Sequence, residues 1–131
     1  MSDPLLLHVE AGVATLRLNR PALHNAFDAG LIAALTAALA RVGADRDVRC
    51  VVLAGEGASF SAGADLHWMR GMATASESAN RDDALALARL MRTLDELPKP
   101  TIARVQGAAF GGVEAFGRGA SHGPGAPAGA R

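Results

Sequence analysis

The feature that most constrains this chain is a unit that occurs twice: a short apolar run followed by a loop of small residues. Residues 49–54 form the first apolar run, and the loop at 60–66 follows it. Residues 101–105 lead in the same way into the loop at 107–112. Continuous apolar runs rich in β-branched residues are typical of strands buried on both faces, as in parallel sheets. The sequence therefore predicts an α/β fold built around a parallel sheet.

A β-hairpin is predicted ahead of the first unit. Residues 5–10 and 13–19 are two apolar runs separated by Ala11-Gly12, and the second run alternates with period two. Arg20-Pro21 should end the second strand, because proline has no N–H to donate to a strand ladder.

A helix is predicted between this hairpin and the first buried strand. Asp28 is a suitable N-cap for a helix that runs to about Val42, with Gly43 as its stop. Apolar residues recur at three- and four-residue spacing and should form one buried stripe, namely Leu31, Ile32, Leu35, Leu39 and Val42.

A longer helix is predicted between the two buried strands. Asp65 would first cap a short helix through Trp68 and Met72, and the longer helix should then cover residues 77–96. The prolines within residues 97–100 would end it, and right-handed crossovers would join the strands. Its predicted buried face consists of Ala84, Leu87, Ala88, Met91 and Leu94.

Composition limits the kinds of partner. The chain has 131 residues, enough for one domain, and its 13 basic residues balance 13 acidic ones. With no net positive charge, the chain has no electrostatic field that would attract nucleic acid or an anionic membrane surface. A single cysteine fits a reducing compartment, and no apolar stretch approaches the roughly 18 residues of a membrane span. We therefore expect a cytoplasmic protein that binds neither nucleic acid nor membrane.

Both small-residue loops are candidates for a site built from backbone. Each is expected to lead into a helix N-terminus, where free backbone N–H groups are presented. Two such groups from separate loops would form an oxyanion hole, which stabilises an oxygen that gains negative charge in the transition state. A glycine-rich turn between a strand and a helix is also common without any function. The spacing alone therefore leaves open whether each loop is a site or an ordinary turn. The glycines of residues 107–112 do not form a dinucleotide-binding fingerprint.

Four groups of segments follow one another along the chain: residues 13–21 with 25–27, residues 51–55, residues 60–66, and residues 99–103 with 105–112. In content and order they resemble the enoyl-CoA hydratase/isomerase (crotonase) family. The resemblance covers roughly residues 5–112 and implies the crotonase-like (ClpP/crotonase) spiral of ββα units, represented by its N-terminal portion. It also implies a protein that handles acyl-CoA thioesters.

The resemblance also implies site residues. The oxyanion-hole N–H groups would be those of Ala64 and Gly112, both of which lack bulk. Asp65 would mainly cap a helix and organise its loop. No cofactor and no metal are implied, since coenzyme A is part of the substrate. Backbone lining the CoA and thioester channel would come from Ala22, His24, Ala62, Gly63, Ala64, Asp65 and Leu66.

Hydration of a 2-enoyl-CoA is the reaction that the resemblance implies. Residues 66–69 most resemble methylglutaconyl-CoA hydratases, which are enzymes of leucine breakdown. Isomerases, dehalogenases and hydrolases of the family share the same oxyanion hole, so the reaction type is inferred from the resemblance alone.

The acid/base residues depart from the family pattern. The family's first glutamate usually lies where Ala115 stands, and Glu114 is one position early, about 100° round a helix. The second glutamate, and the C-terminal helices through which full-length relatives form trimers or hexamers, belong to a segment that this chain is expected to lack. The alternative is a non-catalytic fragment that at most binds acyl-CoA.

The resemblance ends at Val113. We expect a partial family domain over residues 1–112 and a non-family tail over residues 113–131. The tail is predicted to be disordered, because residues 117–131 contain no branched aliphatic or aromatic side chain to bury. Our hypothesis is that the coding frame shifted in the glycine run and left a truncated enzyme.

Resequencing of the coding locus checks this hypothesis. A second reading frame that encodes a family-like second half is the expected result. An intact frame without such a continuation would contradict the frameshift.

Overall fold

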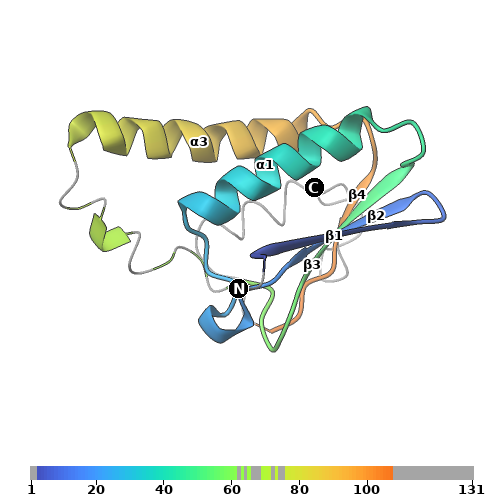
Figure 1. The fold of residues 1–131 in the computed structure, drawn as a ribbon, viewed down its shortest axis with the longest axis horizontal. Helices are drawn as coiled ribbons and strands as arrows, with labels where there is room; N and C mark the ends of the chain where they lie inside the picture. The colour runs from blue at the N-terminus through green and yellow to red at the C-terminus, as the bar shows by residue number, and fades with distance from the viewer. Residues whose placement is uncertain are drawn as a thin grey trace.

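The computed structural model describes residues 3–61, 63, 65, 69–71, 73 and 76–107. The described elements form two layers, a four-stranded sheet and two long helices that cover one of its faces (Figure 1). The predicted α/β class is confirmed. The predicted disordered tail lies outside the described residues, as do Trp68 and Met72 of the predicted short helix.

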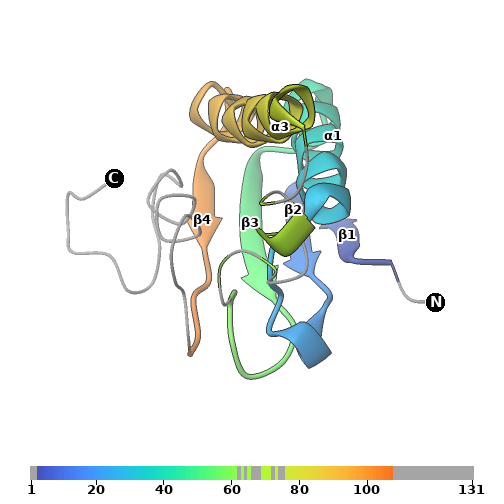
Figure 2. The same ribbon diagram turned by 90° about the vertical axis from the view of Figure 1, so that its left-hand side faces the viewer.

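The sheet has the order β1-β2-β3-β4 (Figure 2). Strands β1 (Leu5–Glu10) and β2 (Val13–Leu18) form the predicted antiparallel hairpin. Strands β3 (Cys50–Gly55) and β4 (Thr101–Ala103) extend it in parallel, so that β2, β3 and β4 run in the same direction. Their carboxyl ends therefore reach the same edge of the sheet.

Burial explains why these segments are strands. In β2, the inward residues Ala14, Leu16 and Leu18 are buried and alternate with half-buried ones. Every residue of β3 after Cys50 is buried, which confirms the predicted central strand. Strand β4 is shorter than predicted. It ends at Ala103, and the chain then turns toward the loop that follows β3.

Helix α1 (Ala29–Ala44) begins as the sequence predicts. The Asp28 carboxylate accepts a hydrogen bond from the Leu31 N–H at 2.9 Å, which confirms the N-cap. Its predicted stop was wrong, since Gly43 lies inside the helix. Gly43 packs against Leu97, because a Cβ at position 43 would stand 2.8 Å from Leu97 Cδ1.

Lys99 secures the end of α1. Its ammonium group donates to the Val42 carbonyl oxygen at 2.6 Å and also to the carbonyl oxygen of Asp45. Val42 lies in the last turn of the helix and Asp45 is its C-cap, and the helix dipole favours a cation at this end. The end of α1 is thus fixed by a residue that lies two positions before β4.

Helix α3 (Glu77–Asp95) starts at Ser76, whose hydroxyl accepts a hydrogen bond from Ala79 N at 3.1 Å. Its predicted buried face was partly wrong. Ala84 and Ala88 are exposed, whereas Leu90 is fully buried together with Leu94. Ala88 lies about 160° round the helix from Leu90 at ~100° per residue. Alanine is compatible with either face of a helix, so the prediction included Ala84 and Ala88 and omitted Leu90.

The hydrophobic core lies between the helices and the sheet. Both helices contribute leucines to it, α1 packs against α3, and α1 also contacts β1 and β2. The largest fully buried side chains are Phe60, Leu16, Leu18, Leu31, Ile32, Leu35, Leu39, Leu53, Leu90, Val42 and Val51. None of the described helices is long and apolar enough to cross a membrane.

Truncation of two leucines on α3 tests this packing. Leu90→Ala should lower the free energy of unfolding by about 2–5 kcal/mol, because it leaves a cavity in the core. Leu85, which is 56% exposed on the same helix, is the matched control, and Leu85→Ala should change it by less than about 0.5 kcal/mol. Urea denaturation measures both. Equal losses would contradict the assigned face.

Candidate functional site

The loops that follow β2, β3 and β4 meet at one edge of the sheet. Because these strands are parallel, their carboxyl ends emerge side by side, and Figure 2 shows the three segments leaving the same side of the sheet. Backbone bonds join them: Glu56 N donates to Leu18 O at 2.8 Å, and Phe60 N donates to Gln106 O at 2.7 Å. In α/β sheets, ligands bind at this carboxyl edge.

Asn25 ties the first of these loops to the second. Its side chain is fully buried, and its Nδ2 donates to the carbonyl oxygens of Glu56, Ser59 and Phe60 at 2.9, 3.0 and 3.2 Å. Its Oδ1 accepts from the backbone N–H of Arg20 at 2.7 Å. The backbone φ of Asn25 is +55°, a left-handed conformation that asparagine tolerates better than most residues.

The loop that contains Gly63 is held on both sides of position 64. Phe27 N donates to Gly63 O at 2.7 Å, and Asp65 N donates to Phe27 O at 2.7 Å. The buried hydroxyl of Ser61 donates to Asn25 O at 2.7 Å and accepts from Gly63 N at 3.3 Å. The described part of this loop is therefore anchored both by backbone bonds to Phe27 and by the Ser61 side chain.

Arg20 connects this loop to the start of α1. Its guanidinium group pairs with the Asp65 carboxylate at 2.9 Å and with the Asp28 carboxylate at 3.2 Å. It also donates to the Ala26 carbonyl oxygen. The Arg20 and Asp65 side chains are only 16% and 12% exposed, so water screens their pair less than it would a surface pair. Arg20 thus links the N-cap of α1 to Asp65.

The second predicted loop begins beside the first. Gln106 Nε2 donates to the carbonyl oxygens of Gly55 and Gly57 at 2.7 and 3.1 Å. Gly107 has a φ of +60°, and a Cβ there would overlap the carbonyl oxygen of Ala58. Glycine is therefore required at this position, because the backbone of one loop lies directly against the other.

The structure locates four of the predicted site residues. Ala22 lies on an exposed 3₁₀ turn, η1 (Pro21–Leu23), and His24 ends that turn with Nδ1 3.3 Å from Ser59 Oγ. Gly63 and Asp65 lie in the anchored loop. The Asp65 carboxylate accepts from the Arg20 guanidinium group, and the Asp65 carbonyl oxygen accepts from Met69 N at 2.9 Å. Ala62, Ala64, Leu66 and Gly112 lie outside the described residues.

Sequence reasoning missed the roles of Arg20, Asn25 and Ser61. In the sequence, Arg20 is predicted only to end a strand. Its ion pairs with Asp28 and Asp65 are formed by the fold. Asn25 is the only amide side chain among residues 20–30, and this is the signal that could have indicated its structural role. Within the described ranges, no group of three His, Cys, Asp or Glu side chains could hold a metal ion.

The chain matches known proteins over most of its length. The family profile described as Enoyl-CoA hydratase/isomerase matches residues 8–117. A 4-chlorobenzoyl coenzyme A dehalogenase-2 from Arthrobacter sp is 43% identical over 77% of this chain and 37% of that protein. A 1,2-epoxyphenylacetyl-CoA isomerase from Escherichia coli is 39% identical over 85% of this chain and 43% of that protein. This chain spans less than half the length of these curated relatives.

Solved structures share the fold. A putative enoyl CoA hydratase/isomerase (crotonase) from Legionella pneumophila superposes with a TM-score of 0.89 at 42% identity, over 92% of this chain and 47% of that one. An enoyl-CoA hydratase from Shewanella pealeana gives 0.89 at 41% identity, over 92% and 45%. The predicted crotonase-like fold is thereby confirmed.

Substitution of Asn25 tests the junction of the loops. Asn25→Asp keeps the shape but replaces the donor to three carbonyl oxygens by an acceptor, so the unfolding free energy should fall by about 3 kcal/mol. Asn19→Asp is the control, because the Asn19 amide makes one exposed hydrogen bond, to Asp3 O. It should cost less than about 1 kcal/mol by chemical denaturation. Similar losses at both positions would refute the role of Asn25.

Proposed function

Because this chain belongs to the enoyl-CoA hydratase/isomerase family, we propose that it binds an acyl-CoA thioester and serves the hydration of a 2-enoyl-CoA. The relatives described above are named for reactions of CoA thioesters, and a putative enoyl-CoA hydratase from Thermus thermophilus is 39% identical over 82% of this chain. The observation that carries the proposal is the pair of backbone bonds by which Phe27 holds Gly63 and Asp65. They fix the chain on either side of Ala64.

Ala64 is the first proposed oxyanion-hole donor. The carbonyl of Gly63 and the N–H of the next residue belong to one peptide group, and in a trans peptide they point in opposite directions. Phe27 N occupies the carbonyl side. The anchoring of Gly63 by Phe27 supports the proposal that the N–H at position 64 serves as a donor to a thioester oxygen.

Gly112 is the second proposed donor, from the other loop. Support comes from Gln106 and Gly107, which hold the start of that loop against residues 55–60. Two donors on separate loops that begin side by side can converge on one oxygen, and fixed donors stabilise charge as it develops there. Glycine and alanine fit this role because the ligand must touch the backbone.

The CoA portion is assigned to the neighbouring backbone. We propose that the exposed turn with Ala22 and His24 lines the channel, together with Ala62, Gly63 and Leu66. Its support is the contact of His24 with Ser59, which places η1 next to the loop that follows β3. The finer assignment to methylglutaconyl-CoA rests on residues 66–69 alone.

A second candidate function is acyl-CoA binding without turnover. It is favoured by Ala115, which stands where the family's first acid/base glutamate is expected. An oxyanion hole by itself polarises the thioester carbonyl, but addition of water also needs a positioned general base. In this case the chain would bind crotonyl-CoA and leave its double bond intact.

Removal of one N–H tests the proposal. Ala64→Pro eliminates the proposed donor, whereas Ala64→Gly keeps it and serves as the matched control. We expect Ala64→Pro to weaken crotonyl-CoA binding at least about tenfold, with Ala64→Gly within about threefold of wild type. Isothermal titration calorimetry measures affinity, and free CoA is titrated in parallel because it lacks the thioester carbonyl.

The same samples separate the two functions. Loss of enoyl-thioester absorbance reports hydration, and circular dichroism confirms folding. Turnover by the wild-type chain would support the hydratase, and binding without turnover would support the second candidate. A folded Ala64→Pro variant with unchanged affinity for crotonyl-CoA would exclude Ala64 as a donor.

A further inference from the structure

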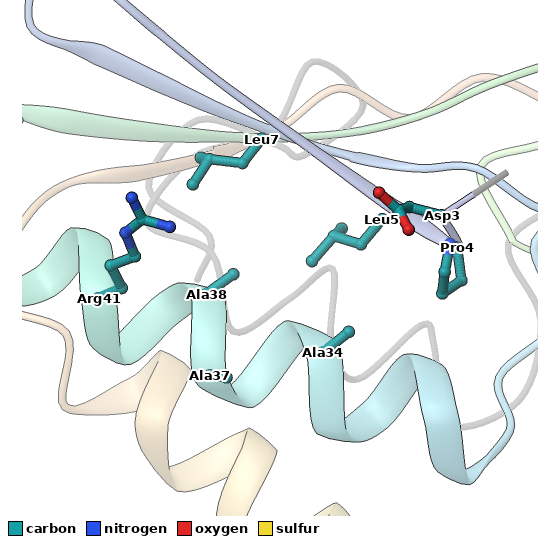
Figure 3. A pocket seen from close by; sticks show the side chains of 8 residues that line it. All are labelled: Asp3, Pro4, Leu5, Leu7, Ala34, Ala37, Ala38 and Arg41. Atoms are coloured by element: carbon teal, nitrogen blue, oxygen red, sulfur yellow. The ribbon is translucent and has the colours of Figure 1, made fainter.

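A groove lies between β1 and α1, at the opposite edge of the sheet from β4. It encloses about 320 Å³ (Figure 3). Its apolar lining comes from Leu5 and Leu7 of the strand and from Ala34 and Ala38 of the helix, whose side chains point toward one another. The groove is separate from the candidate site described above.

The two ends of the groove carry opposite charges. Figure 3 shows Asp3 at one end, near Ala34, and Arg41 at the other, beyond Ala38. Neither side chain takes part in an ion pair within the described residues. The groove therefore presents a carboxylate, an apolar middle and a guanidinium group in a row.

Strand β1 itself is an open edge. It pairs with β2 on one side, and no other described strand lies on the other. Such an edge presents unpaired N–H and C=O groups, which are a template for another strand. Val9 on β1 is 43% exposed and lies on the same face of the strand as Leu5 and Leu7, so apolar surface continues along the strand beyond the groove.

We propose that this edge is the surface on which two copies of the chain associate about a two-fold axis. In this arrangement β1 of one copy lies antiparallel to β1 of the other, and the apolar linings of the two grooves face each other. Asp3 of each copy then lies near Arg41 of the other. The pairing continues the sheet across the interface.

Self-complementarity selects a second copy as the occupant. A two-fold interface uses the same surface on both subunits, so residue i meets residue j while j meets i. A surface with a negative and a positive end around an apolar centre meets this requirement when it is turned through 180°. A fatty chain would fill the apolar middle but would leave one or both charges without a partner. The proposal is independent of acyl-CoA binding.

Charge exchange between the ends tests this interface on the full chain of residues 1–131. Sedimentation equilibrium should show a dimer for the wild-type chain. Asp3→Arg and Arg41→Asp should each raise its dissociation constant at least about tenfold, since each places like charges at both ends of the interface. The double variant, Asp3→Arg with Arg41→Asp, should return to within about threefold of wild type.

Two lysine variants locate the interface. Leu7→Lys places a charge in the apolar lining and should abolish the dimer, whereas Leu85→Lys, on the exposed part of α3, should not affect it. Circular dichroism confirms that each variant is folded. A monomeric wild-type chain at 100 µM or so, well above the micromolar range of weak specific complexes, would overturn the proposal. It would equally be overturned by a dimer that survives either single charge reversal, or by a double variant that stays as weak as the single ones.

Discussion

The hydrogen bonds of the buried Asn25 side chain are the interaction on which the rest of the candidate site depends. Asn25 lies in the loop after β2, yet its amide donates to carbonyl oxygens in the loop after β3. The bonds to the Ser59 and Phe60 carbonyl oxygens are buried, and a buried polar group without a partner costs about 1–3 kcal/mol. The left-handed backbone at Asn25 is tolerated because the same residue satisfies them. The fixed backbone of Asn25 then anchors Ser61, whose hydroxyl donates to Asn25 O.

The sheet explains why such a junction forms at this place. Strands β2, β3 and β4 are parallel neighbours, so three segments distant in sequence leave the sheet side by side. The helices that join them cross one face of the sheet and bury leucines there. The loops at the carboxyl edge are held in place by polar contacts. Lys99 fixes the other end of α1. The fold thus separates the part of the chain that supplies stability from the part that supplies the site.

Much of this fold could be predicted from the sequence, because the signals are local. Period-two alternation in residues 13–18, the continuous apolar run of β3 and the Asp28 cap each act within a few residues. The errors arose where a distant contact decides. Gly43 is a packing glycine only because Leu97 lies against it, and the buried face of α3 follows Leu90, which meets partners on other elements. The roles of Arg20 and Asn25 depend on residues more than thirty positions away.

The way in which the loops are bonded bears on how this edge can move. Asn25 bonds to Arg20 on one side and to residues 56–60 on the other, while Gly107 rests against Ala58. A lid swings about a hinge because its contacts lie mostly within itself, whereas these loops hold one another. Movement of the loop after β2 away from the loop after β3 would leave the buried Asn25 amide without its acceptors, so these two loops are expected to move together.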